Sequence, residues 1–587
     1  MKEFDFTNEK LPEKLAEIQR RTSSLSIFRI ISFLGLIGFF VLGVSESLVW
    51  FVLFFTTGAG FVYLVSVYNH LKDQEAIYSS LEKMDSNRKL RVVRNLKSFE
   101  QGVEFQSKHH PFSNDLDLFG DHSLFQLINH TVSKEGKIKL SKLIVSEFDI
   151  NKAAIYRASV DELSTKPAFL HAMESIGLAF YRDEKSIHAW MNWMKENEQI
   201  KSWIMPFVWI GPIGGVILTI LAYLEVIPSG FYGIWVLIGT GLLAAVFRSL
   251  KKAGEEIPSR NQLKTYRYWL IEIEKQEFLS DGLRNAAGGF CEANSKASEL
   301  LEELDRLGLW IQNRLNFLYF PINLFFWTDL LLYVRLQKWK SKYGNLVSEF
   351  PEQLANWEML VSLGTFQYEL GGKGEIIEVA SGIKGLEIVH PLLSSEIAVS
   401  NDFAQNSDMS IILLTGSNMS GKTTFMRTLG INCVLVNLGL RPFAKEFGFG
   451  NFQLYTSMRN TDNLGESVSS FYAELSRIKL LIDRIEVGEE IFFLLDEILK
   501  GTNTEDRISG SEALIRQVVA TKAIGIISTH DIELADLENR IETVRNFSFH
   551  SEIHDQSIDF DYKLKTGACL SFNAHKLMEL MGIRFQN

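Results

Sequence analysis

A glycine-rich stretch in the last third of the chain has the residue types and spacing needed to bind phosphate groups. Residues 416–423, GSNMSGKT, fit the pattern G-x-x-x-x-G-K-[ST] and closely follow the apolar residues 411–414. In such a loop, glycines let backbone N–H groups turn toward a β-phosphate, lysine reaches the β- and γ-phosphates, and the final hydroxyl coordinates Mg²⁺. A chance glycine-rich turn is the alternative. The apolar run before the loop favours the first interpretation, in which a phosphate loop connects a strand to a helix that begins near Gly421.

The residues of this loop have distinct expected roles. Lys422 is expected to bind phosphate and to assist the reaction, and Thr423 is expected to hold the metal ion. The full expected phosphate-binding set of the loop is Gly416, Ser417, Asn418, Met419, Ser420, Gly421, Lys422, Thr423 and Thr424.

Two further apolar runs end in residues that can complete a catalytic site. Residues 491–495 end in Asp496 and Glu497, and residues 523–528 lead toward His530. Buried parallel strands read as continuous apolar runs, and a carboxylate at such a strand end can hold Mg²⁺ while the next one orients the attacking water. We therefore assign metal binding to Asp496, water activation to Glu497 and γ-phosphate contact to His530. The alternatives are a strand that simply meets solvent and a surface histidine in a turn.

A serine cluster precedes the helical pattern of residues 471–481. Ser467, Ser469 and Ser470 place hydroxyl groups where the free N–H groups of a helix N-terminus are expected, which is a natural anion site. Ordinary capping of the helix, which needs only one serine, is the alternative.

Apolar segments long enough to cross a bilayer accompany these motifs. Residues 48–68, 202–224 and 226–247 contain no charged side chain and reach the roughly 20 residues that a spanning helix needs. Residues 30–44 are shorter but gain length if Arg29 extends to the interface. Short turns join the segments in pairs, so we expect two membrane hairpins. The alternative is that they are buried helices of a soluble core.

Basic residues flank both expected hairpins and are absent from their turns. They are Lys10, Lys14, Arg20, Arg21, Lys72, Lys83, Arg88, Lys89, Arg91 and Arg94 around the first hairpin, and Lys195, Lys201, Arg248, Lys251 and Lys252 around the second. By the positive-inside rule we expect a multi-pass protein of the cell membrane with both termini and the C-terminal domain in the cytoplasm. A further apolar stretch, residues 315–328, is too short to span and contains Pro321, so a packed helix end is expected there.

Length and composition set broader limits. A chain of 587 residues is expected to form two to four domains. Its formal net charge of −11 argues against a protein coated in basic surface, although a local basic groove for nucleic acid stays open. Cys291, Cys433 and Cys569 are scattered, which excludes the spacing of a disulfide scaffold or zinc site and favours a reducing compartment.

Three stretches in the C-terminal third, TGSNMSGKTTFMRTLG, FFLLDEILKGTNTED and STHDIELADL, together resemble the ATPase domain of MutS proteins. The resemblance begins near His390-Pro391 and ends in residues 562–583. It implies ATP and Mg²⁺ as ligands and a homodimer in which ATP lies between two subunits, with Ser469 and Ser470 of one subunit facing the phosphates of the other. It also gives Asn418 a contact with the γ-phosphate. Lys500 stands where the family usually has arginine, which keeps the charge but loses a bidentate donor.

A second resemblance lies upstream. Residues 122–163 resemble the start of the helical core of the family, with a turn carrying Thr131 and Gly136 between two helices. Residues 354–369 resemble the lever that returns to the ATPase domain, and the second expected hairpin takes the place of the lever tips and DNA clamp. The residues before this core leave no room for the mismatch-recognition domain of the family, so direct mismatch reading is not expected.

The expected fold is therefore an α/β P-loop ATPase domain of the ABC type, joined to an all-α lever and core domain, with four transmembrane helices in two hairpins. The expected domain boundaries are 1–110 for the first hairpin and its linker, 111–370 for the helical core with the second hairpin at about 202–247, and 371–587 for the ATPase domain.

The resemblance implies an ATP hydrolase whose nucleotide cycle moves a dimer and its levers, acting on DNA in a repair- or recombination-related process at the membrane. Two other outputs stay open: a mechanical membrane ATPase that moves its spans or a protein partner without DNA, and a scaffold that binds ATP without turnover. The complete set of motif residues disfavours the scaffold. Basic runs at residues 91–97 and 335–342 could supply a DNA surface, although juxtamembrane basic runs more often face lipid headgroups.

Overall fold

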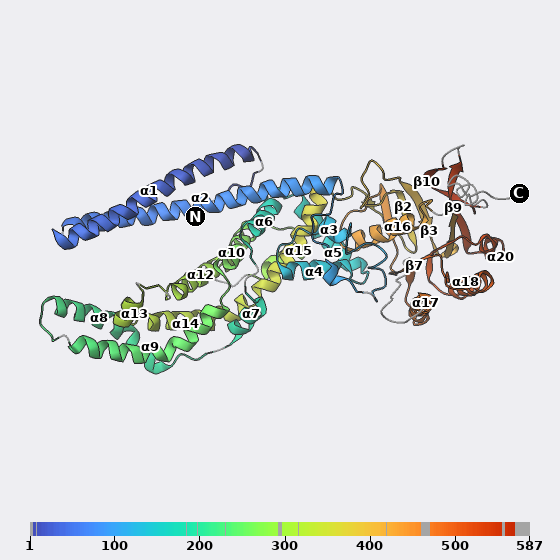
Figure 1. The fold of residues 1–587 in the computed structure, drawn as a ribbon. Coiled ribbons are helices and arrows are strands. Elements are labelled where there is room, and N and C mark those ends of the chain that lie inside the picture. Colours follow the sequence, from blue (N-terminus) through green and yellow to red (C-terminus); the bar gives the residue numbers. More distant parts are fainter. Residues whose placement is uncertain are drawn as a thin grey trace.

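A computed structural model describes residues 4–569 of the protein, except residues 8, 48, 108, 183–184, 197, 229, 291–295, 315, 318, 418, 459–469 and 554–557. Two β-sheets and their covering helices form one end of an elongated molecule (Figure 1). Helices and their connecting loops build the rest of the described chain, and two helical arms extend away from the sheets (Figure 1).

The larger sheet contains the three apolar runs that the sequence singled out. Its strand order is β10-β9-β4-β8-β7-β6. The strands are β4 (Ile411–Gly416), β6 (Gln453–Ser457), β7 (Ile491–Asp496), β8 (Ile524–Thr529), β9 (Val544–Ile553) and β10 (Ile558–Thr566). β4 is parallel to both β8 and β9, and β7 is parallel to β6 and β8. The residues that follow β4, β7 and β8 therefore emerge at one edge of the sheet, which is where open parallel sheets bind ligands.

A smaller sheet of order β1-β5-β2-β3 lies beside it. Its strands are β1 (Glu375–Ile376), β2 (Ile383–Ile388), β3 (Asn401–Gln405) and β5 (Glu446–Phe449). The ring of Phe403 on β3 packs edge-on against Phe425, with centroids 5.5 Å apart, and so joins this sheet to the helix that follows β4.

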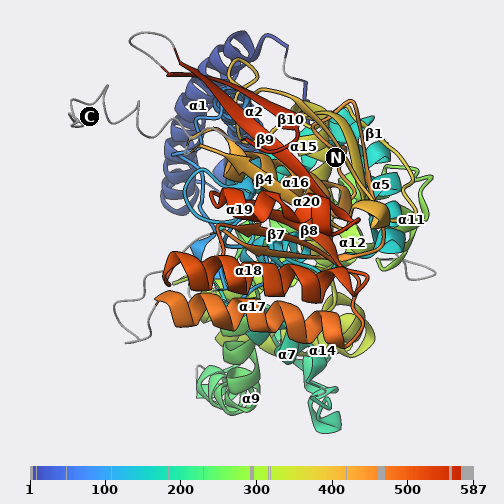
Figure 2. The same cartoon turned by 90° about the vertical axis from the view of Figure 1, so that its right-hand side faces the viewer.

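Helices cover both faces of the larger sheet, and the side chains of β4 alternate between them. Ile412 and Leu414 pack in one core with α16 (Lys422–Asn437), whereas Ile411 and Leu413 pack in a second core with α17 (Ser470–Glu486) and α18 (Thr504–Val519). Figure 2 shows α17 and α18 side by side. The short helices α19 (Ile532–Ala535) and α20 (Leu537–Arg540) precede β9.

The helical core adjoins the sheets and continues into one of the arms. Its helices are α3 (Leu124–Ile128), α4 (Lys134–Ile144), α5 (Ile150–Ser164), α6 (Pro167–Phe180), α7 (Ile187–Lys195), α10 (Arg260–Glu274), α11 (Asp281–Gly288), α12 (Ala297–Asn313), α14 (Thr328–Val347) and α15 (Phe350–Glu369). The expectation that Gly136 lies in a turn is wrong: it lies in the first turn of α4. A Cβ at Gly136 would meet the Glu358 carboxylate at 2.8 Å, so close packing against α15 explains the glycine.

The buried Glu358 carboxylate on α15 joins α15 to the start of α4. It accepts hydrogen bonds from Val132 N at 2.8 Å, from Ser133 N at 3.0 Å and from the Ser133 hydroxyl. Glu358→Ala leaves these donors buried without an acceptor, so we expect it to lower the free energy of unfolding by about 3 kcal/mol. Glu352→Ala, on the same helix, removes only an exposed ion pair with Lys139 and is expected to cost less than about 1 kcal/mol. Thermal unfolding of the two purified variants compares them directly, and equal melting temperatures would refute the role of Glu358.

Within the part of the chain that the structure describes, four segments are long and apolar enough to cross a membrane, judged by length and composition. They are α1 (Leu11–Ser45), α2 (Val49–Val92), the segment Ser202–Leu221 with α8 (Phe207–Tyr223), and α9 (Gly230–Glu256). Their apolar windows are at most 22% buried, so large side chains such as Phe55 and Leu237 are exposed. The turns of the α1–α2 hairpin and the α8–α9 pair both lie at the end opposite the sheets (Figure 1).

A short helix, α13 (Tyr319–Phe326), lies against α8 and α9 where the sequence predicted a packed helix end. Trp235 Nε1 on α9 donates to Phe325 O at 2.8 Å, and the Trp235 ring stacks on Trp327 with centroids 4.2 Å apart. Trp327 has a φ of 53° and separates α13 from α14. The outer side of α13 is apolar and open, with Phe320 63% exposed.

α2 connects the first apolar hairpin directly to the sheet-bearing end. It is one helix of 44 residues, roughly 66 Å long. Just after it, Arg94 Nε donates to Pro391 O at 2.7 Å. His122 Nε2 lies 2.9 Å from Leu392 O, so the 391–392 segment is held by both contacts.

Candidate ATPase site

The glycine-rich loop lies between β4 and α16 and has a backbone that requires glycine at two positions. Gly416 has a φ of 150° and Gly421 a φ of 104°. A Cβ at Gly416 would also meet Phe549 O at 2.6 Å. The hydroxyls of Ser417 and Ser420 are buried and have no hydrogen-bond partner among the described residues. A phosphate oxygen would supply the acceptors that these hydroxyls and the loop N–H groups need, so the loop fits a phosphate.

The Lys422 ammonium group lies inside this loop. Its Nζ donates to Gly416 O at 2.8 Å and to Ser417 O at 3.0 Å, and the residue is 5% exposed. Burial lowers the pKa of Lys422, while the nearby carboxylates of Glu497 and Asp496 oppose that shift. A buried cation held by two neutral carbonyls is well placed to exchange them for a charged phosphate.

Oxygen donors suited to Mg²⁺ meet beside the loop. The Thr423 hydroxyl donates to Asp496 Oδ2 at 2.6 Å, and the Ser528 hydroxyl donates to Asp496 Oδ1. Asp496 and Ser528 are register partners on β7 and β8, so the sheet itself fixes this contact. Mg²⁺ prefers one or two carboxylate or hydroxyl oxygens completed by water and phosphate, which fits this pair. The described part of the chain contains no group of three or more histidine, cysteine or acidic residues that could hold a metal by themselves.

Glu497 lies at the centre of a small ion cluster. Its Oε1 is 2.7 Å from His530 Nε2 and its Oε2 is 2.8 Å from Lys500 Nζ. The hydrogen bond with His530, and then that with Lys500, lower the pKa of Glu497 from 4.5 to about 2. Glu497 is therefore a carboxylate at neutral pH. Because its folded pKa is depressed, the cluster stabilises the fold above about pH 4.5 and loses this contribution as the pH falls toward 2.

Two contacts that the sequence did not indicate hold the turns around this cluster. The Glu474 carboxylate on α17 accepts from Leu499 N. Arg507 on α18 binds Asp531, next to His530, through two hydrogen bonds of 2.8 and 2.6 Å. No short motif signals them, because the partners lie 25 and 24 residues apart.

A cavity of about 470 Å³ adjoins the loop and has room for a nucleotide. Its polar side carries the loop residues and Glu497. Its other side is lined by Ile388, His390, Leu393, Ile397, Val399 and Tyr562. Such an apolar wall suits a flat base. The His-Pro segment was visible in the sequence, but nothing there indicated Ile397 or Tyr562.

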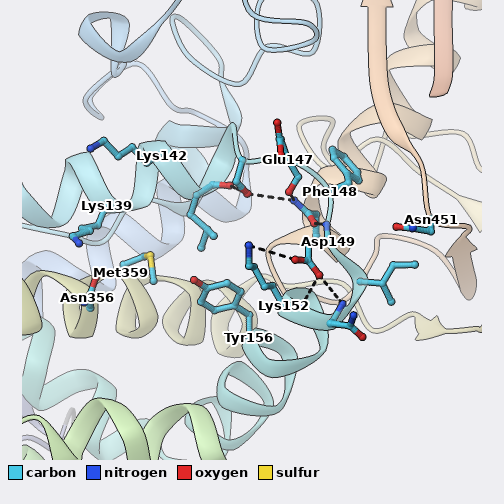
Figure 3. Close-up of a pocket in the computed structure, with 15 residues that line it drawn as sticks. Lys139, Lys142, Glu147, Phe148, Asp149, Lys152, Tyr156, Asn356, Met359 and Asn451 are labelled. Atoms are coloured by element: carbon cyan, nitrogen blue, oxygen red, sulfur yellow. Dashed lines mark hydrogen bonds and ion pairs between the residues drawn. The ribbon is translucent and has the colours of Figure 1, made fainter. Parts of the chain in front are cut away.

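A larger cavity of about 900 Å³ lies between the helical core and the sheets (Figure 3). Three of its charged groups have ionic partners: Lys139 pairs with Glu352 at 2.8 Å, outside the lining, and Lys152 pairs with Asp149 at 3.4 Å. None of the motif residues lines it, so size does not mark the reactive site in this protein.

The structure thus brings Lys422, Thr423, Asp496, Glu497 and His530 together at one edge of the sheet. Thr424 lines the adjoining cavity, and Met419 is 81% exposed on the loop. Asn418 and Ser469 lie outside the described residues. Ser470 is the first residue of α17, and its side chain is likewise outside the description.

Comparison with known proteins shows which family this domain resembles. Residues 412–583 match the family model described as MutS domain V. Residues 412–583 thus form a domain of the MutS type. All three stretches that resembled MutS in the sequence lie in the matched range, which also contains β7, β8, the site residues and all of β4 except its first residue.

Curated MutS relatives also match part of the chain. The DNA mismatch repair protein MutS of Alkaliphilus metalliredigens is 27% identical over 244 residues, which cover 40% of this chain and 28% of the relative. The MutS protein of Thermotoga neapolitana is 29% identical over 235 residues, covering 39% and 28%, and that of Thermotoga petrophila is 26% identical over 250 residues, covering 41% and 31%. The chain therefore matches less than a third of the length of these relatives.

Proposed function

We propose that this protein is a membrane-bound ATPase of the MutS type, with a P-loop fold in its C-terminal domain. The observation that carries the proposal is the convergence of Lys422, Thr423, Asp496 and Glu497 beside a nucleotide-sized cavity. The match to MutS domain V supports the same activity, because it rests on the sequence and is independent of side-chain geometry.

The site residues divide the reaction between them. Lys422 and the N–H groups of residues 416–424 bind the phosphates, and Thr423 and Asp496 hold Mg²⁺. When bound, Mg²⁺ neutralises charge on the phosphate oxygens. Glu497 orients the attacking water, and its low pKa favours accepting a hydrogen bond over removing a proton. His530 is paired with Glu497 in this structure. It would sense the γ-phosphate by exchanging its contact with Glu497 for a contact with that phosphate.

The apolar helices are proposed to cross the membrane as two hairpins with the ATPase domain in the cytoplasm. Both hairpin turns point away from the sheets, so one membrane can receive both hairpins without crossing the ATPase domain (Figure 1). The positive-inside pattern supports the same orientation.

The active form is proposed to be a homodimer that closes on ATP. Ser470, the first residue of α17, and Ser469, which precedes it in the sequence, would then meet the nucleotide of the partner. α17 also contacts the turn after Glu497 through Glu474, which links dimer closure to the catalytic carboxylate.

DNA at the membrane is the proposed substrate, which rests on the curated relatives being DNA mismatch repair proteins. A second candidate is mechanical action on the membrane arm or a protein partner without DNA. The continuous helix α2 favours it, since this helix runs from the first hairpin to Val92. Arg94, two residues later, binds Pro391 O beside the cavity residue His390.

One binding experiment separates these outputs. The full-length protein in lipid nanodiscs is mixed with duplex, branched and mismatched DNA, with and without ATP, over a salt series. Binding that depends on DNA structure and nucleotide, and weakens with salt as phosphate contacts require, supports the DNA substrate. Failure of every DNA form to bind at low salt, while ATP turnover persists, would contradict it and favour the mechanical role.

A further inference from the structure

A groove of about 480 Å³ lies between α12 and α14, apart from the ATPase site. It is lined by Glu303, Arg306, Leu307, Trp310, Arg335, Lys338, Trp339, Lys342 and Tyr343. Four basic side chains thus face a single carboxylate in a protein whose net charge is −11. This local excess of positive charge suits an anionic ligand.

Two of these cations are available to a ligand. Arg306 already pairs with Glu302, and Lys342 donates to the Tyr343 hydroxyl at 2.6 Å. Arg335 and Lys338, in contrast, are exposed and form no ion pair with any residue that the structure describes. The guanidinium of Arg335 lies over the Trp310 ring, 5.9 Å from its centroid.

The groove begins where the apolar part of the arm ends. Trp310 Nε1 donates to the hydroxyl of Tyr319, the first residue of α13, at 3.0 Å. Arg314 Nε contacts Asp329 at 2.8 Å, and the Arg314 guanidinium lies 5.6 Å from the centroid of Phe247. Phe247 is the last apolar residue of α9 before its basic end. These contacts place the Asp329 level of α14 at the membrane boundary.

Arg335 and Lys338 lie six and nine residues beyond Asp329, roughly 9 and 14 Å along α14. The headgroup layer is about 5 to 8 Å deep on each side, and long basic side chains extend toward it. Both cations are therefore within reach of lipid phosphate. The outward apolar side of α13, where Phe320 is 63% exposed, suits contact with the acyl chains on the hydrocarbon side of this boundary.

We propose that the groove between α12 and α14 binds the phosphate of an anionic phospholipid headgroup, with Arg335 and Lys338 as its cations. The proposal rests on the proposed membrane insertion of α8 and α9. The bound lipid would fix the arm at α13, where the chain turns from α12 into α14.

The aromatic residues of the groove argue for lipid over single-stranded nucleic acid. Stacking of bases needs open ring faces. Trp339 is 3% exposed, and one face of Trp310 is covered by Arg335. These rings build the wall of the groove, while an interfacial position suits Trp310 and Tyr319.

The test uses the full-length protein in phosphatidylcholine vesicles with about one-fifth phosphatidylglycerol. Vesicle flotation reports insertion, and native mass spectrometry after extraction reports retained phosphatidylglycerol. We expect one retained phosphatidylglycerol per chain, and an occupancy at least about fivefold lower in Arg335→Gln/Lys338→Gln. The matched control Arg248→Gln/Lys251→Gln removes equal charge from α9 at the same boundary and is expected to keep the lipid.

Each of the other possible outcomes would contradict a specific part of the proposal. Equal loss of phosphatidylglycerol in both double variants would mean that basic residues near the membrane attract the lipid without a specific site, and would contradict binding in the groove. Binding of a labelled oligonucleotide that falls in Arg335→Gln/Lys338→Gln, with lipid retention unchanged, would make the groove a nucleic-acid site. Failure of the parent protein to float with vesicles would overturn membrane insertion itself, and the groove proposal with it.

Discussion

The Glu497→Gln variant is expected to bind ATP as the parent protein does and to hydrolyse it at least about a hundredfold more slowly. Glutamine keeps the size of the side chain, so the fold of the turn is preserved. It replaces one carboxylate oxygen by an amide and removes the charge that His530 and Lys500 contact at 2.7 and 2.8 Å. The attacking water then loses its charged acceptor, while the phosphate-binding loop is untouched.

Single-turnover hydrolysis and equilibrium binding of a fluorescent ATP analogue separate these effects. Glu505→Gln is the matched control, because Glu505 is an exposed glutamate in the first turn of α18 of the same domain. It should leave both quantities unchanged. Hydrolysis by Glu497→Gln at the parent rate would show that another group orients the water.

Lys422→Ala is expected to weaken ATP binding by roughly ten- to a hundredfold. The Lys422 ammonium group is buried at the loop, where its Nζ contacts Gly416 O and Ser417 O. Its removal takes away the one positive side chain that lines the nucleotide-sized cavity within the described residues. Charge-assisted hydrogen bonds to phosphate are about twice as strong as neutral ones, so this loss exceeds that of a single loop N–H group.

Titration calorimetry with a non-hydrolysable ATP analogue measures the change. Lys522→Ala is the control, because the Lys522 side chain is 82% exposed at a distance from the loop and only pairs loosely with Glu490 at 3.5 Å. Circular dichroism checks that both variants remain folded. Unchanged affinity in folded Lys422→Ala would contradict the assignment of the loop.

The elements that carry the site could be predicted because each has a strong local signal. β4, β7 and β8 are continuous apolar runs, and the helix after the loop begins at Lys422, one residue past the predicted Gly421. The resemblance to the MutS family is confirmed for this domain by the match over residues 412–583. The roles of the site residues remain predictions, although the structure brings five of them together.

Other features depend on contacts between distant residues and leave no local pattern. The cavity wall combines Ile397 with Tyr562, and the Glu497 turn depends on Glu474. Gly136 resembled a turn residue, but it is a helix residue whose missing side chain makes room for Glu358. The position of α13 beside α8 and α9 could not be read from a stretch that was too short to span.

The arrangement of the two arms in the dimer offers the most direct test of coupling between ATP and the membrane region. A single nitroxide label at Glu255→Cys, near the end of α9, reports the distance between the arms of two subunits in a nanodisc. Cys433 and Cys569 are buried, and Cys291→Ser removes the third cysteine. We predict that ATP shifts this distance distribution in Glu497→Gln, and that removing nucleotide restores it. An unchanged distribution in protein shown to have bound ATP would contradict an ATPase that moves its membrane arms.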